Sequence, residues 1–257
     1  MGDARAGSQL IGLRRDGCDG EDELIAHPAT RRINFTGSTK VGRIIAEKAG
    51  RQLKRVLLEL GGKAPMVLLE DADLDRAAAA ASFGAFFHQG QICMSTERIA
   101  VDRAVSDALA QKLAERARAL PVGDPREHTT AIGPLVNQAA VDRVSELVRD
   151  AVQKGATALS GGESDGHDEA VRVANDSEYG LSAAVSSENV PAAPELAQRI
   201  ESGICHVNDT TVHDEPQMPF GGVKASSFGR FGGRAVLEEF TELRWSSVQS
   251  LKRDYPI

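Results

Sequence analysis

The sequence FGAFFHQGQICMSTERIA, residues 83–100, is the stretch from which the rest of the chain can be interpreted. Its first residues have the pattern of the last turns of a helix, Gly90 is suited to the exit from that helix, and ERIA begins an apolar strand. Cys93 is therefore predicted to lie on the loop between a helix and a strand. A cysteine in such a place is an inert small hydrophobe unless its surroundings activate the thiol.

A second stretch, KRVLLELGGK at residues 54–63, reads as a strand that carries Glu59 to its C-terminal end, just before a Gly61-Gly62 turn. Open α/β sheets place their ligands beyond the carboxyl ends of the strands. We therefore expect Glu59 to face the thiol of Cys93. The alternative is that Glu59 is an exposed acid at the end of a strand, because glutamate normally faces solvent.

A third stretch has the order strand, glycine turn, helix. Residues 31–35 predict the strand, Thr36, Gly37 and Ser38 form the turn, and the helix that follows ends at Gly50 as a C-cap. Backbone N–H groups and the positive end of the dipole at such a helix start attract a phosphate. Alternatively, Thr36 or Ser38 only caps the helix.

These stretches resemble motifs of the aldehyde dehydrogenase superfamily, in the family's order and spacing. Residues 59–63 are similar to its general-base motif, residues 90–93 to its nucleophile motif, and residues 35–39 to its cofactor-phosphate turn. PFGGVK at residues 219–224 is similar to the motif near the end of its catalytic domain. Residues 88–98 resemble most closely the bacterial salicylaldehyde, vanillin and benzaldehyde dehydrogenases.

The resemblance implies oxidation of an aromatic aldehyde to the carboxylic acid with NAD or NADP. Cys93 would attack the aldehyde to form a thiohemiacetal and then a thioester, and Glu59 would be the base for the thiol and for the hydrolytic water. The residues implied to bind the cofactor are Thr36, Gly37, Ser38, Leu60 and Gly61. Those implied to line the aldehyde pocket are Phe87, Ile92 and Phe220, although Phe220 can also be read as simple core packing.

The family pattern is longer than this chain, and the resemblance begins at about residue 23. The family's second oxyanion donor, an Asn amide, and its adenosine contacts belong to an upstream part without a counterpart here. Residues 161–167 resemble a junction at which a later segment, with its Glu-x-Phe-Gly-Pro motif, is left out. We therefore expect an N-terminally truncated and internally deleted chain. Ser227 stands where the family pattern has Gly, which predicts strain in that loop.

The alternation of strands and helices predicts an α/β fold of the aldehyde dehydrogenase type. Residues 1–60 are interpreted as the remnant of a Rossmann-type dinucleotide-binding domain, and residues 61–240 as the catalytic domain. Residues 241–257 are interpreted as an oligomerisation strand and tail. In the family this strand pairs with a neighbouring subunit, which implies a homo-oligomer.

Composition excludes several classes of function. The 257 residues carry a net charge of -7, which argues against nucleic acid and membrane surfaces as partners. No apolar run approaches the roughly 20 residues that cross a bilayer, and the N-terminus does not read as a signal peptide. Three cysteines make a disulfide framework improbable and indicate the cytoplasm. The histidines and acids near Cys205 lack metal-site spacing, so no metal is expected.

Two functions stay open at this point. The chain is either an NAD(P)-dependent aromatic aldehyde dehydrogenase, alone or completed by another chain, or a non-redox remnant that keeps a thiol site and an oligomerisation surface. The missing ribose and adenosine contacts favour the second for an isolated chain, because hydride transfer depends on positioning. Ester hydrolysis without a dinucleotide would reveal a surviving thiol site.

Overall fold

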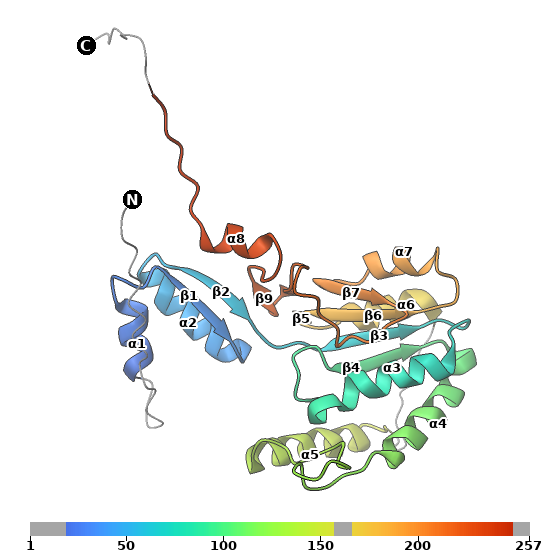
Figure 1. Ribbon diagram of the computed structural model, residues 1–257. Coiled ribbons are helices and arrows are strands. Elements are labelled where there is room, and N and C mark those ends of the chain that lie inside the picture. Colours follow the sequence, from blue (N-terminus) through green and yellow to red (C-terminus); the bar gives the residue numbers. More distant parts are fainter. Residues whose placement is uncertain (1–18, 157–165, 249–257) are drawn as a thin grey trace.

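The computed structural model describes residues 19–156 and 166–248. The chain first builds a small sheet, crosses after Glu59 to a larger parallel sheet, and returns to the small sheet near its end (Figure 1). Helices pack against both sheets, which confirms the predicted α/β class. The predicted domain boundary at residue 60 stays a prediction, although the crossing between the sheets lies beside it.

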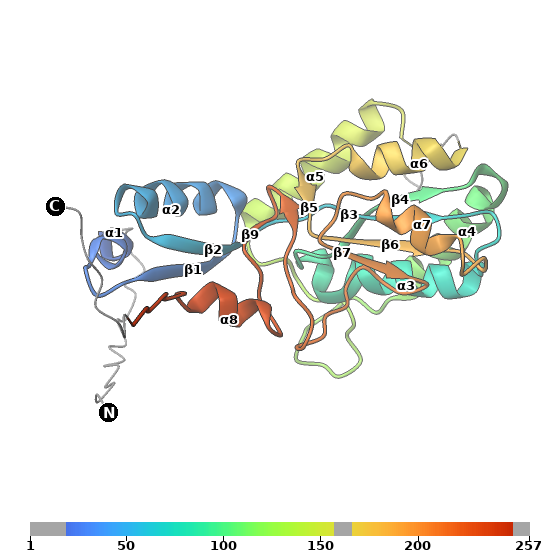
Figure 2. The ribbon, with the colours of Figure 1, turned by 90° about the horizontal axis from the view of Figure 1, so that it is seen from above.

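The small sheet has the strand order β1-β2-β9. Its strands are β1 (Arg32–Thr36), β2 (Arg55–Glu59) and β9 (Ser227–Phe228). β1 and β2 are parallel, with Thr36 opposite Glu59, and β9 is antiparallel to β2. Helices α1 (Asp19–Ala26) and α2 (Thr39–Arg51) pack on one face, and α8 (Ala235–Phe240) lies on the other (Figure 2). Arg32 ties α8 to the sheet through a 3.0 Å ion pair with Glu239.

The end of α2 differs from the prediction. Gly50 was expected to be the C-cap, but the helix continues to Arg51 and Gln52 is the C-cap. Leu53 then takes a left-handed conformation with φ 53°, so the reversal into β2 falls on a leucine instead of the glycine. The polar, Gly-rich residues up to about 22 predict a loop, followed by a short helical turn from Glu23 to His27. The helix α1 is present but begins earlier, at Asp19, and residues 1–18 lie outside the described part of the chain.

The larger sheet has the order β4-β3-β6-β7, and all its neighbours are parallel. Its strands are β3 (Ala64–Leu68), β4 (Thr96–Val101), β6 (Ser182–Ser186) and β7 (Ile204–Val207). One face is covered by α3 (Leu74–Phe86) and α4 (Arg103–Ala119), and the other by α6 (Gly166–Asn175) and α7 (Ala193–Gln198). A parallel sheet covered on both faces explains why β3 is an uninterrupted apolar run.

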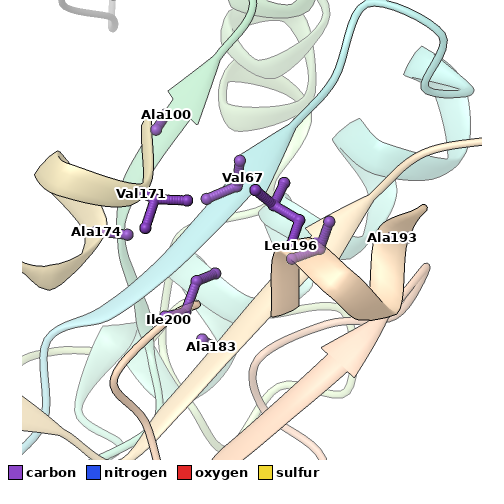
Figure 3. Packing of buried hydrophobic residues seen from close by; sticks show 9 residues of the cluster. Val67, Ala100, Val171, Ala174, Ala183, Ala193, Leu196 and Ile200 are labelled. Atoms are coloured by element: carbon purple, nitrogen blue, oxygen red, sulfur yellow. The ribbon is translucent and has the colours of Figure 1, made fainter. Parts of the chain in front are cut away.

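Alternation along β3 distributes its side chains between two cores. Val67 points toward α6 and α7, where it packs with Val171 and Leu196 (Figure 3). Met66 and Leu68 point to the opposite face, toward the alanines of α3. Because successive side chains of a strand face opposite sides, a single apolar strand supports both layers of helices.

Several shorter or less buried elements complete the described chain. They are the 3-10 helix η1 (Phe87–Gly90), α5 (Gln138–Gln153), and the paired strands β5 (Tyr179–Gly180) and β8 (Val223–Lys224). α5 has no buried residue, and its Val144, Leu147 and Val148 are exposed. Residues 157–160, whose sequence predicts a short strand, lie outside the described residues. In residues 19–156 and 166–248, no helix is long and apolar enough to cross a membrane.

Residues 241–248 were predicted to form a strand, and in the isolated chain they do not. They run away from α8 as an extended segment (Figure 1), without a ladder partner among the described residues. Leu243, Trp245 and Val248 are almost fully exposed. A strand exists only when a neighbour accepts and donates its backbone hydrogen bonds. The segment therefore lacks such a neighbour within residues 19–156 and 166–248.

Candidate active site

Glu59 is the last residue of β2 and is 5% exposed. Its Oε2 accepts a 3.0 Å hydrogen bond from the hydroxyl of Ser227, whereas its Oε1 is buried without a protein partner. Burial raises the pKa of Glu59 to about 7, and the Ser227 hydrogen bond and the positive charge of Arg230 oppose this rise. The alternative of an exposed acid is therefore wrong, and Glu59 is poised to exchange a proton near neutral pH.

Glu59 is buried because the loop that follows Pro219 folds over it. The N–H of Leu60 donates to the Ser226 carbonyl at 2.8 Å, which holds the returning chain beside β2. Gly221 has φ 150°, and a Cβ added to it would lie 3.0 Å from Glu59 Oε1. Glycine at this position thus lets the backbone approach the carboxylate closely.

Cys93 lies in a tight turn between η1 and β4. Ser95 closes this turn, because its N–H donates to the Ile92 carbonyl at 3.0 Å and its Oγ accepts from the Ile92 N–H at 3.3 Å. The preceding His88 and Gln89 are left-handed, with φ 53° and 58°. Left-handed residues other than glycine cost about 1–3 kcal/mol each and persist where the surrounding structure holds them, often at functional sites.

The thiol of Cys93 is half-buried and unpaired. Burial raises its pKa, and the negative charge of nearby Glu59 raises it further; the backbone N–H groups of Cys93 and Met94 act in the opposite direction. The thiol is therefore protonated at neutral pH and requires a base before it can act as a nucleophile. The same two N–H groups are donors suited to negative charge that develops beside the sulfur.

The two loops meet through their backbones. A Cβ added to Gly62 would lie 2.1 Å from the carbonyl oxygen of Cys93, a distance that no side chain tolerates. The turn that follows Glu59 therefore lies directly against the cysteine turn. This contact, together with the electrostatic effect of Glu59 on the thiol, agrees with the prediction that Glu59 and Cys93 lie near each other.

A buried network of hydroxyl groups supports the cysteine turn from behind. Thr211 Oγ1 donates to the Met94 carbonyl at 2.8 Å and lies 2.8 Å from Thr96 Oγ1. The Ser182 hydroxyl in turn donates to the Thr211 carbonyl at 2.7 Å. Sequence reasoning did not identify these residues. The hydroxyl of Thr96, adjacent to the nucleophile motif, is the one local signal, because Thr211 and Ser182 are distant in the chain.

The turn of Thr36, Gly37 and Ser38 is exposed at the carboxyl edge of the small sheet. It is fixed beside the acid by a 3.0 Å hydrogen bond from the Gly37 N–H to the Glu59 carbonyl. Ser38 caps α2, since its hydroxyl accepts from the Val41 N–H at 3.3 Å. The first turn of α2 carries no acidic residue, so its exposed N-terminus fits a phosphate group.

Leu60 and Gly61, the other predicted cofactor residues, lie on the connection after β2. The side chain of Leu60 is buried against Gly42 of α2, so its carbonyl is the group left for a cofactor. A Cβ added to Gly61 would lie 3.5 Å from the ring of Tyr179 and 3.7 Å from Thr39 Oγ1. Their role in binding stays a prediction.

The three predicted pocket residues come from two separate segments of the chain. Phe87 lies before the cysteine, is 52% exposed, and stacks on Phe83 with ring centroids 4.8 Å apart. Ile92 is half-buried at the start of the cysteine turn. Phe220 lies on the loop over Glu59, where it exchanges two 2.8 Å backbone hydrogen bonds with Phe231. The aldehyde pocket stays a prediction.

Polar side chains also gather near β7. His213 Nδ1 lies 2.7 Å from Asp209 Oδ2, and its ring stacks on His206 with centroids 5.0 Å apart. Within the described residues, no group of three or more His, Cys, Asp or Glu side chains is arranged to hold a metal ion.

Comparisons with known proteins identify relatives of this chain. The Aldehyde dehydrogenase family matches residues 13–168 and 164–246, two segments that meet at the predicted junction. A vanillin dehydrogenase of Pseudomonas sp. (strain HR199 / DSM 7063) is 50% identical over 270 residues, which cover 92% of this chain and 56% of that protein. The chain thus spans about half the length of the curated relatives it matches.

Solved structures give the same result. A salicylaldehyde dehydrogenase from Pseudomonas putida G7, complexed with salicylaldehyde, matches with a TM-score of 0.87 and 42% identity over 92% of this chain and 56% of that chain. An NAD-dependent aldehyde dehydrogenase from Sinorhizobium meliloti matches with a TM-score of 0.84 and 33% identity over 91% of this chain and 54% of that chain.

Replacing Glu59 with Gln is expected to change how stability depends on pH. The pKa of Glu59 is about 7 in the folded chain, above its ordinary value of 4.5. Its contribution to stability is therefore complete below pH 4.5 and is lost as the pH rises through 7. Glu59→Gln should unfold at a higher urea concentration relative to wild type at pH 8 than at pH 4.5. An equal difference at both pH values would contradict the burial of an ionisable Glu59.

Replacing Gly62 with Ala is expected to disturb the cysteine turn. The added Cβ would meet the Cys93 carbonyl oxygen, so overpacking should lower the free energy of unfolding by about 1–3 kcal/mol. It should also change the rate at which iodoacetamide modifies Cys93, measured by mass spectrometry. The matched control is Gly50→Ala, which meets nothing within 4 Å inside α2 and should stabilise the chain by about 0.5–1 kcal/mol. Similar effects at both glycines would argue against the contact between the two loops.

Proposed function

The chain belongs to the aldehyde dehydrogenase family, and we propose that it oxidises an aromatic aldehyde to the carboxylic acid through Cys93, with NAD or NADP as the oxidant. The observation that carries this proposal is the buried Glu59, whose pKa is about 7 and whose Oε1 lacks a protein partner, beside an unpaired thiol. A base with such a pKa is matched to proton transfer at neutral pH.

The first step is the transfer of the thiol proton from Cys93 to the carboxylate of Glu59, directly or through one water molecule. The transfer exchanges one negative charge for another within the same site, so it avoids placing a thiolate beside an ionised carboxylate. The thiolate then forms a bond to the aldehyde carbon while the carbonyl π electrons move onto oxygen. The backbone N–H groups of Cys93 and Met94 are the donors available to that oxyanion.

The residues of the phosphate turn fit one part of a dinucleotide. Thr36, Gly37 and the N-terminus of α2 would hold its pyrophosphate, and the carbonyl of Leu60 and the backbone of Gly61 lie on the adjacent connection. NAD or NADP, when bound, supplies the two-electron acceptor that converts the thiohemiacetal into a thioester.

Hydrolysis of the thioester uses Glu59 a second time, after the proton taken from Cys93 has been released to solvent and the carboxylate is ionised again. The carboxylate takes a proton from a water molecule whose oxygen attacks the acyl carbon, the carbon–sulfur bond breaks, and the sulfur leaves as the Cys93 thiolate. The unpartnered Oε1 is the oxygen available to that water. The product is the carboxylic acid, and the thiolate recovers the proton held by Glu59.

The relatives and the residues around the thiol favour an aromatic aldehyde. Relatives named for vanillin and salicylaldehyde act on aromatic aldehydes, and this chain places Phe87 and Ile92 beside the cysteine turn. Phe220 would close the pocket from the loop over Glu59. Because the reaction needs a free thiol, the proposal places the chain in the reducing cytoplasm.

The alternative function is a thiol site that acts without a dinucleotide. One observation favours it: the described part of the small sheet contains two parallel strands, β1 and β2, and the two-residue antiparallel β9. This sheet offers few surfaces for the adenosine half of a dinucleotide, whereas the pair Cys93 and Glu59 lies within this chain. Such a site would hydrolyse activated esters.

The decisive assay follows reduced nicotinamide by absorbance. Purified protein is mixed with vanillin, salicylaldehyde or benzaldehyde and with NAD or NADP, and 4-nitrophenyl acetate is tested separately without dinucleotide. Cys93→Ser should abolish both reactions, and Glu59→Gln should slow turnover by about a hundredfold to ten-thousandfold, because thiol activation and thioester hydrolysis both lose their base.

Cys93-dependent ester hydrolysis without any nicotinamide reduction would replace the dehydrogenase proposal by the alternative. Silence in both assays, from protein with a cooperative unfolding transition, would contradict both functions.

The exposed segment 241–248 is proposed to pair with a second copy of the chain. Leu243 and Trp245 are almost fully exposed on an unpaired extended segment, which is a ready template for another strand. Sedimentation velocity should show an oligomer that Leu243→Glu with Trp245→Glu converts to monomer, while the exposed Val122→Glu leaves it intact. A monomeric wild-type protein would exclude this role.

A further inference from the structure

We propose that Ser227 is a positioning residue for Glu59: its hydroxyl holds the carboxylate by Oε2 and leaves Oε1 as the oxygen that exchanges protons. This inference rests on the proposed role of Glu59 as the base. It concerns a residue that was predicted only to strain its loop. That prediction is wrong, because Ser227 is not among the residues with positive φ, and it lies in a regular strand pair opposite Glu59.

The direction of the hydrogen bonds around Ser227 follows from their partners. The Gly222 N–H donates to Ser227 Oγ at 2.7 Å, and Ser227 Oγ lies 3.0 Å from Glu59 Oε2. A hydroxyl has one hydrogen to donate, and an ionised carboxylate only accepts. The backbone of Gly222 therefore orients the hydroxyl, and the hydroxyl donates its hydrogen to Oε2.

This arrangement makes the two carboxylate oxygens different. Oε2 already accepts a hydrogen bond from Ser227, so a proton carried by Glu59 belongs on Oε1. Oε1 is buried and unpartnered, and it faces Gly221, at which an added Cβ would lie only 3.0 Å away. A buried acceptor without a protein partner is the atom that a water molecule or a proton satisfies.

The charged and titratable groups that act on Glu59 come from both neighbouring loops. Arg230, on the loop after β9, favours its ionised form, and Cys93, on the turn before β4, couples to it electrostatically. The Ser227 hydrogen bond also favours the ionised form and opposes the effect of burial on the pKa. Loss of the hydroxyl should therefore raise the pKa of Glu59 and leave less carboxylate at neutral pH.

The neighbouring Ser226 provides a matched control. Its side chain is fully buried, and its Oγ accepts a 3.0 Å hydrogen bond from the Gly180 N–H. Ser226→Ala therefore removes a serine hydroxyl next to Ser227 in the sequence. That hydroxyl bonds to the Gly180 N–H and not to Glu59. It should lower stability without changing the titration of Glu59, which separates a positioning effect from a purely structural one.

The test measures the titration of Glu59 by infrared spectroscopy of the whole chain, without aldehyde or dinucleotide. The carbonyl band of the protonated acid is assigned by its disappearance in Glu59→Gln. Ser227→Ala should move the midpoint of this band upward by about one pH unit, since a hydrogen bond to a charged group is lost. Ser227→Thr keeps the hydroxyl and should restore the wild-type midpoint, and Ser226→Ala should leave it unchanged.

A second readout is the pH profile of Cys93 alkylation, because the charge of Glu59 acts on the thiol. The inflection that Glu59→Gln removes should move in the same direction in Ser227→Ala. If Ser227→Ala does not fold, Ser227→Cys fills the same space with a weaker donor and should also raise the midpoint of the infrared band.

An unchanged midpoint in the folded Ser227→Ala or Ser227→Cys variant, or a Ser227→Thr midpoint that matches that of Ser227→Ala, would overturn the inference. The readouts need no turnover, so a chain that lacks dehydrogenase activity but shows the shift would overturn the proposed function and keep the positioning role. Activity without the shift would do the reverse.

Discussion

The chemistry of the candidate site depends on the burial of one carboxylate. Glu59 is held out of water at the end of β2 with a single hydrogen bond from a side chain, and desolvation moves its pKa to about 7. An acid left exposed at that strand end would be ionised and inert at neutral pH. The carboxylate is buried because the chain returns from the larger sheet. β9 pairs with β2, and the loop before β9 covers the carboxylate.

Close approach between backbones explains the glycines of the two central motifs. Gly62 leaves space for the carbonyl of Cys93, and Gly221 leaves space for Oε1 of Glu59; a Cβ at either position would lie within about 3 Å of those atoms. On the far side of the cysteine turn, Thr211 holds the Met94 carbonyl. Main-chain contacts and buried hydroxyl groups thus fix the positions of the thiol and the acid. These two groups lie on loops that come from different sheets.

Apolar surface remains uncovered on both parts of the chain. Ile44 on α2 and Leu147 on α5 continue amphipathic stripes but are exposed, as is Trp245 on the extended segment after α8. A periodic apolar pattern specifies which face of an element avoids water, and it does not specify which neighbour covers that face. These exposed apolar surfaces are available to a binding partner. The relatives are nearly twice as long as this chain, so they contain further segments that could cover such surfaces.

The sequence by itself determined the α/β class, the strands and helices around its motifs, and the pairing of an acid motif with a cysteine motif. Strand and helix periods, glycine turns and motif order are local signals. Only the tertiary structure decided that Glu59 is buried, that residues 241–248 have no ladder partner among the described residues, and that Ser227 bonds to Glu59 instead of straining its loop. The physical reason is that burial, hydrogen-bond partners and pKa depend on groups distant in the chain, which are brought together only when two sheets pack.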